Sequence, residues 1–249
     1  IVVGLIIRLK VSETPAFQKL EAESDRRKAP VLEVFAQYKR QVFIGLFATM
    51  TIYITQGLTT VWGVSVVVAA GENQSEVLNW KALGALTTFV VTFIAARISD
   101  RIGRKKALLG GHILAAVLAL PLVLLIVTGE IGPYAVAIIV GNGIVQGVLF
   151  GPIAAFVSEL FPAGVRYSGA SVAYQLAAAL GAGLSPMVAS ALILIPGGGA
   201  YLIAAVWMVF AVIGFAAVAV SRPALDPVVA HGANSRPSKE SGSPEQTLI

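Results

Sequence analysis

The sequence predicts an all-α integral membrane protein with six transmembrane helices. Its mean hydropathy is +0.83, and only 12% of its residues are charged, whereas soluble domains carry about 25% charged residues. Several apolar stretches reach the roughly 20 residues that a helix needs to cross the hydrocarbon core. Short polar turns separate them. The expected spans are residues 42–69, 77–96, 107–127, 134–157, 169–195 and 200–220.

The remaining segments are assigned by length and polarity. Residues 1–7 are apolar but too short to cross a membrane, and the chain begins with Ile rather than Met, so we expect the end of a truncated transmembrane helix. Residues 8–41 are rich in charge, which indicates a central loop before a six-helix bundle of residues 42–221. Residues 222–249 combine Ser, Pro, Gly and charge without an apolar period, and we expect a disordered tail.

The distribution of positive charge predicts the orientation. Every lysine and arginine except Lys81 falls on one side of the expected spans. Cytoplasmic loops carry the excess of lysine and arginine in membrane proteins. We therefore expect a multi-pass protein of the cell (inner or plasma) membrane, with the central loop and the C-terminal tail in the cytoplasm.

Composition also argues against several classes of function. The chain has no cysteine, which removes disulfides and thiol catalysis. Its cations flank membrane spans rather than an aromatic-studded soluble face, so nucleic-acid binding is not expected. His112, Asp100 and Glu159 lack the spacing of metal ligands or of a catalytic cluster. We expect no enzyme activity, no metal and no cofactor.

Residues 96–106 concentrate charge between two apolar stretches, and these cations require a short aqueous turn. The block D-R-x-G-R-K within them resembles the signature loop of the major facilitator superfamily. That loop joins helices two and three and recurs between helices eight and nine. Ala96 stands here where the family usually has glycine.

Residues 159–169 read E-x-F-P-x-x-x-R-x-x-G. This pattern resembles the turn between helices ten and eleven of sugar porters and of metabolite:proton symporters. Residues 12–17, Ser-Glu-Thr-Pro-Ala-Phe, look like the E-T-P-x-F that follows helix six in metabolite:proton symporters, and residues 169–176 are similar to the eleventh helix of that family.

The resemblance implies the C-terminal six-helix half of a twelve-helix secondary transporter, with substrate held between two bundles. The implied activity is proton-coupled symport of a small organic acid or osmolyte by alternating access. The partners are then the substrate, protons, the lipid bilayer and the missing N-terminal half. Because no acidic residue lies in the middle of a span, a proton-carrying carboxylate is expected in that other half. A sugar porter and a non-transporting membrane sensor remain the alternatives.

The two turn motifs supply candidates for a gate on the cytoplasmic side. Carboxylates and guanidinium groups at helix ends can pair across the turns, and the resemblance implies a latch that opens as the two halves rock. The alternative is a solvated turn that serves only topology. The gate candidates are Asp100, Arg101, Gly103, Arg104, Glu159 and Arg166.

Uncharged polar residues within the spans are the candidates for the substrate cavity, because a buried amide or phenol requires a hydrogen-bond partner. They fall into three groups, two of which have the spacing of one helix face. The alternative is hydrogen bonding between packed helices. The candidates are Tyr53 with Gln56, Asn142 with Gln146, and Tyr174 with Gln175.

Three further features have ordinary structural interpretations. Trp62 approaches one end of its span and is expected to be a lipid-facing or interfacial anchor. His112 is expected to face headgroups or loop carbonyls. Gly147 and Gly151 have the spacing that lets two helices approach closely.

The predicted orientation can be tested with single cysteines, since the chain has none to remove. In Asn73→Cys an impermeant maleimide should label the protein in intact cells. In Ser235→Cys it should label only after permeabilisation. Labelling of Ser235→Cys in intact cells would overturn the orientation.

Overall fold

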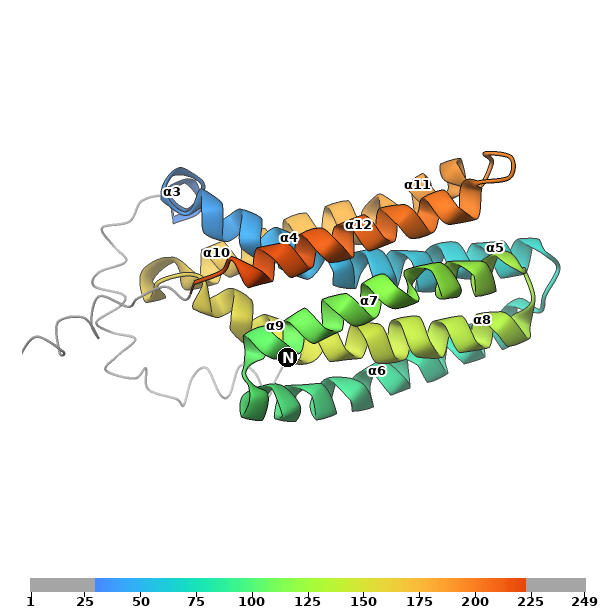
Figure 1. The fold of residues 1–249 in the computed structure, drawn as a ribbon, viewed down its shortest axis with the longest axis horizontal. Helices are drawn as coiled ribbons and strands as arrows, with labels where there is room; N and C mark the ends of the chain where they lie inside the picture. The colour runs from blue at the N-terminus through green and yellow to red at the C-terminus, as the bar shows by residue number, and fades with distance from the viewer. Residues whose placement is uncertain (1–29, 223–249) are drawn as a thin grey trace, which may run out of the picture.

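The computed structural model describes residues 30–222, with side chains from Val34 onward, and within them six helices are long and apolar enough to cross a membrane. These helices lie side by side along the long axis of the molecule (Figure 1). The predicted all-α membrane fold is confirmed. The expected truncated helix, most of the central loop and nearly all of the tail lie outside the described residues. The six spans are Lys39–Ala69, Gln74–Ile102, Arg104–Val127, Ile131–Glu159, Ala163–Leu192 and Gly199–Ala219.

Three of the spans are uninterrupted α-helices. They are α6 (Gln74–Ile102), α7 (Arg104–Val127) and α12 (Gly199–Ala219). A short helix, α3 (Pro30–Gln37), precedes the first span.

The other three spans each contain a π-helical turn near the middle, and η1 contacts both η2 and η4. The first span consists of α4 (Lys39–Gln56), η1 (Gly57–Trp62) and α5 (Gly63–Ala69). The fourth consists of α8 (Ile131–Ala137), η2 (Ile138–Gln146) and α9 (Gly147–Glu159). The fifth consists of the 3-10 turn η3 (Ala163–Val165), α10 (Arg166–Ala178), η4 (Ala179–Gly183) and α11 (Ser185–Leu192).

The first span is the centre of the bundle. In its most apolar 18-residue stretch 78% is buried, whereas the corresponding share for α6 is 17%. The helices α10, α12 and η2 pack on α4. Trp62 lies in this span and is only 2% exposed. Its predicted role as an interfacial anchor is therefore wrong, because neighbouring helices cover the side of the span that carries it.

The ends of α6 differ in how they are fixed. At its start the Asn73 side chain accepts hydrogen bonds from the backbone N–H of Ser75 at 2.9 Å and of Glu76 at 3.4 Å, which caps the helix. At its other end α6 continues through the charged residues to Ile102. Gly103 alone separates it from α7, with a φ of 95° that favours glycine.

This connection is much shorter than the turn expected from the sequence. The spans were expected to end at residue 96 and resume at residue 107, whereas the helices extend through both charged flanks. Arginine and lysine are good helix formers, so α-helix can persist beyond the apolar stretch. The Gly103 turn and residues 160–162 lie at one end of the bundle, at the left in Figure 1, which we call the cation-rich end.

Glycines allow α6 and α9 to approach closely, as their spacing predicted. A Cβ atom added at Gly147 would lie 2.8 Å from the Cβ of Val91, and one at Gly151 would lie 2.6 Å from the backbone nitrogen of Ala96. At Gly151 the neighbouring atom belongs to the backbone, so rotation of a side chain could not make room for a larger residue.

His112 is fully buried between helices rather than facing headgroups, so that prediction is wrong. Its Nδ1 lies 2.8 Å from the carbonyl oxygen of Leu108, one turn earlier on α7. Its Nε2 fits against α12 because position 214 is glycine; a Cβ there would lie 2.4 Å from Nε2.

The contact at Gly151 predicts a difference between two glycine substitutions. Gly151→Ala should lower the free energy of unfolding by about 1–3 kcal/mol, because α6 must shift away from α9. Gly110→Ala, whose Cβ would meet nothing within 4 Å, should be neutral or stabilising by up to about 1 kcal/mol. Thermal unfolding in detergent compares the two, and equal stability would contradict the close packing.

Candidate functional site

The candidate gate is built around the Gly103 turn. Arg104 begins α7, and Glu159 is the last residue of α9. The Arg104 guanidinium donates a hydrogen bond to the Glu159 carboxylate, and it lies 3.9 Å from the Asp100 carboxylate one turn back on α6. The three side chains join the turn between the second and third spans to the end of the fourth.

Helix dipoles explain why this contact stabilises the end of the bundle. Arg104 sits at a helix N-terminus, where a cation is disfavoured, and Glu159 sits at a helix C-terminus, where an anion is disfavoured. Pairing the two offsets both costs. Both side chains remain partly exposed, 37% for Arg104 and 48% for Glu159, so the pair can separate without burying an isolated charge.

The other gate candidates occupy different positions. Arg101 is exposed and takes part in no ion pair within 4.0 Å among the described residues. Arg166 begins α10, and its Nε donates to the Phe161 carbonyl at 3.2 Å, bracing the turn after α9. Pro162 precedes η3, three residues after the end of α9.

Sequence reasoning missed two cations at the same end. Lys105 donates to the carbonyl oxygens of Ala219 at 2.7 Å and of Ser221 at 3.1 Å, and Arg40 donates to that of Val220 at 3.2 Å. These carbonyls lie at the end of α12, where a helix lacks partners and attracts positive charge. The sequence shows the cations, but it does not show that their partners are the carbonyls at the end of α12.

Asn142 and Gln146 lie on η2, and Asn142 contacts α6 through Thr88. They are 6% and 2% exposed, and the Asn142 amide donates to the Gln146 side-chain oxygen. The Thr88 hydroxyl lies 2.9 Å from the Asn142 carbonyl oxygen and 3.3 Å from its side-chain oxygen. In this conformation both amides are therefore partnered within the bundle.

The four remaining cavity candidates come from two helices that pack together. Tyr53 and Gln56 on α4 are half-buried, as is Tyr174 on α10, whereas Gln175 is exposed. These four candidates thus lie on helices that pack on one another, whereas Asn142 bonds to Thr88 of α6 and Gln146 bonds to Asn142.

A ladder of buried threonines runs along the first span and was also missed. Thr59 donates to the Thr55 carbonyl at 2.7 Å, Thr55 donates to the Thr51 carbonyl at 2.8 Å, and Thr51 donates to the Phe210 carbonyl on α12 at 3.3 Å. Their spacing of four residues was the available signal. Tyr134 adds a bond to the Thr59 carbonyl at 3.2 Å.

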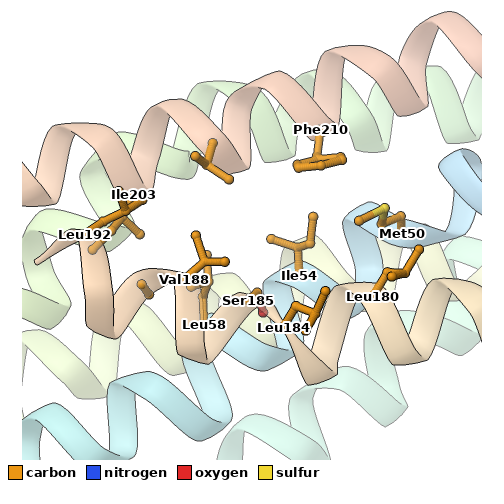
Figure 2. A pocket seen from close by; sticks show the side chains of 12 residues that line it. Met50, Ile54, Leu58, Leu180, Leu184, Ser185, Val188, Leu192, Ile203 and Phe210 are labelled. Carbon is orange, nitrogen blue, oxygen red and sulfur yellow. The ribbon is translucent and has the colours of Figure 1, made fainter.

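An apolar pocket of about 140 Å³ lies among the first span, the fifth span and α12, with its lining side chains in Figure 2. Its lining includes Ile54 and Leu58 of the first span, Val188 of the fifth span and Phe210 of α12. Ser185 supplies the single polar side chain among the described residues that line it. A charged metabolite would lose its hydration there without compensation, so the pocket is unsuited to an organic acid.

Comparison with known proteins gives the family. Residues 9–224 match the family described as Sugar (and other) transporter. An inner membrane metabolite transport protein, YhjE, of Escherichia coli (strain K12) is 30% identical over 201 residues, covering 76% of this chain and 44% of that protein. No solved structure matches the chain at a significant level.

Two further relatives have named substrates. A citrate-proton symporter of Klebsiella pneumoniae is 26% identical over 84% of this chain and 46% of its own length. A proline/betaine transporter of Escherichia coli (strain K12) is 27% identical over 77% of this chain and 40% of its own length. The chain thus spans less than half the length of these relatives.

Six apolar spans, two turn motifs at one end and a family match over most of the sequence agree. The chain belongs to the Sugar (and other) transporter family of the major facilitator superfamily.

Proposed function

We propose that this chain is the C-terminal half of a proton-coupled symporter for a small organic acid or osmolyte, and that it works by alternating access with a second six-helix half. Relatives named as citrate-proton symporter and proline/betaine transporter support the substrate class. The chain's own spans carry their acids near the ends, as Asp100 and Glu159 do. The proton-carrying carboxylate is accordingly assigned to the other half.

The observation that carries the proposal is the contact of Arg104 with Glu159 and Asp100. It joins the end of α9 to the turn between α6 and α7 by side chains that stay partly exposed. As a cytoplasmic latch it stabilises one conformation of the transporter and separates as the halves rock. Gly103 gives the turn its shape, Arg166 braces the turn after α9, and Arg101 is available to the opposite half.

The substrate cavity is assigned to the face that meets the second half. Gln175 is exposed, and Tyr53, Gln56 and Tyr174 are half-buried, so these side chains can exchange their present surroundings for a substrate. Asn142 and Gln146 join them only when their bond opens, since in this conformation they are bonded to one another.

The latch predicts a charge-exchange result in a transporter assembled with its second half. Arg104→Glu and Glu159→Arg should each slow uptake about two- to fivefold, the range of a partly exposed ion pair. The double variant should recover part of the loss. A double-mutant cycle at equal membrane abundance measures the coupling.

Arg101 provides the matched control, since it lies in the same turn without an ion pair among the described residues. Arg101→Glu combined with Glu159→Arg should show no recovery. Coupling near zero for Arg104 with Glu159, or equal coupling for Arg101, would refute the latch.

A sugar porter is the second candidate, favoured by the turn of residues 159–169 and by the name of the matched family. Uptake separates the two, because an organic acid or betaine would be accumulated in one case and a hexose in the other. A membrane sensor without transport would bind ligand and move none.

The division into halves predicts what this chain does alone. In proteoliposomes with an imposed proton gradient, it should insert but accumulate no citrate, 2-oxoglutarate, shikimate or betaine, because alternating access needs two bundles. Co-expression with a matching N-terminal half should restore uptake. Concentrative uptake by the chain alone, shown to be monomeric, would contradict the assignment.

A further inference from the structure

An apolar groove lies between α6 and α7, in the half of the bundle next to the cation-rich end. It has a volume of about 230 Å³, and Ile94, Ile98 and Ile102 of α6 face Ala107 and Gly110 of α7 across it. Its lining on α6 begins at residue 91, so it extends about 16 Å along the helix at 1.5 Å per residue. That length is about half of a hydrocarbon core, the depth of one leaflet.

The groove is open toward the surroundings rather than filled by the protein. Ile94, Ile98 and Ile102 are all about half-exposed. A Cβ atom at Gly110 would meet nothing within 4 Å. Water gains no hydrogen bonds from an apolar groove at membrane depth, so a hydrocarbon chain is the chemically matched occupant.

Lys106 stands where this groove meets the polar surface. It lines both the groove and a cavity of about 690 Å³ at the cation-rich end. Among the described residues Lys106 makes no hydrogen bond or ion pair, in contrast to Arg104, which contacts Glu159, and Lys105, which binds the end of α12.

The first turn of α7, which contains Lys106, has more cations than anionic partners. The first turn of α7 contains three cations and no acidic residue, and no side chain caps its N-terminus. The nearby carboxylates of Asp100 and Glu159 are both paired with Arg104. Lys106 is thus a cation without an ion pair at the mouth of the groove; Arg101 also has none among the described residues, but it lines neither the groove nor the cavity.

We propose that an anionic phospholipid binds here, with one acyl chain in the α6–α7 groove and its phosphate at Lys106. The apolar groove selects the chain, and the lysine selects a headgroup with net negative charge over a zwitterionic one. The acyl-chain groove contains neither Arg104 nor Glu159, whereas the cavity at Lys106 is lined by both, so the phosphate would sit next to that contact.

Photolabelling tests the proposal on the whole chain in liposomes. Phosphatidylglycerol that carries a diazirine near the end of one acyl chain should label peptides within residues 91–111, mapped by mass spectrometry. The phosphatidylcholine analogue should label them about fivefold less, as expected for one basic side chain at an anionic headgroup. Lys106→Ala and Lys106→Gln should each reduce labelling by phosphatidylglycerol to the level of phosphatidylcholine.

Two further variants distinguish the contribution of the lysine from those of nearby charge and of the groove. Arg97→Ala removes an exposed cation of α6 that lines neither the groove nor the cavity, and labelling should stay within twofold of the original. Gly110→Leu should suppress labelling by both lipids, because its side chain fills the groove. Gel filtration checks that each variant is folded.

Three outcomes would overturn the site. Equal labelling by the two lipids would show that the site does not select an anionic headgroup. Unchanged labelling in the folded Lys106 variants would show that Lys106 does not bind the phosphate. Displacement of the label by millimolar inorganic phosphate would mean that Lys106 binds a free anion rather than a lipid.

Discussion

Within hydrocarbon every polar group of the chain must find a partner inside the protein, and the central span of this bundle depends on that constraint most strongly. It is surrounded by other helices, yet it carries several buried threonines. Most of their hydroxyls return to carbonyls of the same helix four residues earlier, as Thr49 does to Gly45 at 2.7 Å. The span thus satisfies its own polar groups and presents an apolar surface on which α10 and α12 can pack.

At the cation-rich end, by contrast, charged side chains of one helix bond to groups on other helices. Cations at the start of α7 would be destabilising for that helix alone. Arg104 is directed to the end of α9 and Lys105 to the end of α12. One helix N-terminus therefore holds two helix C-termini, and the positions of three spans are coupled through two adjacent residues.

The sequence was sufficient for features that depend on local chemistry. The six spans follow from the length and polarity of each stretch, and the close approach at Gly147 and Gly151 follows from small residues at helical spacing. Features that depend on which helices are neighbours were not predictable. Trp62 and His112 meet other helices rather than lipid or headgroups, and the carbonyl partner of Lys105 lies 114 residues along the chain.

The same distinction applies to the candidate site. The motifs indicated that Glu159 lies near the arginines, but the choice of Arg104 over Arg101 depends on how α7 is rotated. The pairing of Asn142 with Gln146 followed from their spacing. The contact of Asn142 with Thr88 did not, because it requires the position of α6.

The π-helical turns have a consequence for the relation between sequence length and helix orientation. A π turn accommodates one more residue than an α turn, and one residue rotates an α-helix by about 100°. A deletion of one residue within Gly57–Trp62 could therefore be absorbed by reverting to α-helix, leaving α5 in place. Relatives whose lengths differ by one residue in this segment can thus keep the same inward face, and the gap in their alignment belongs within the π turn.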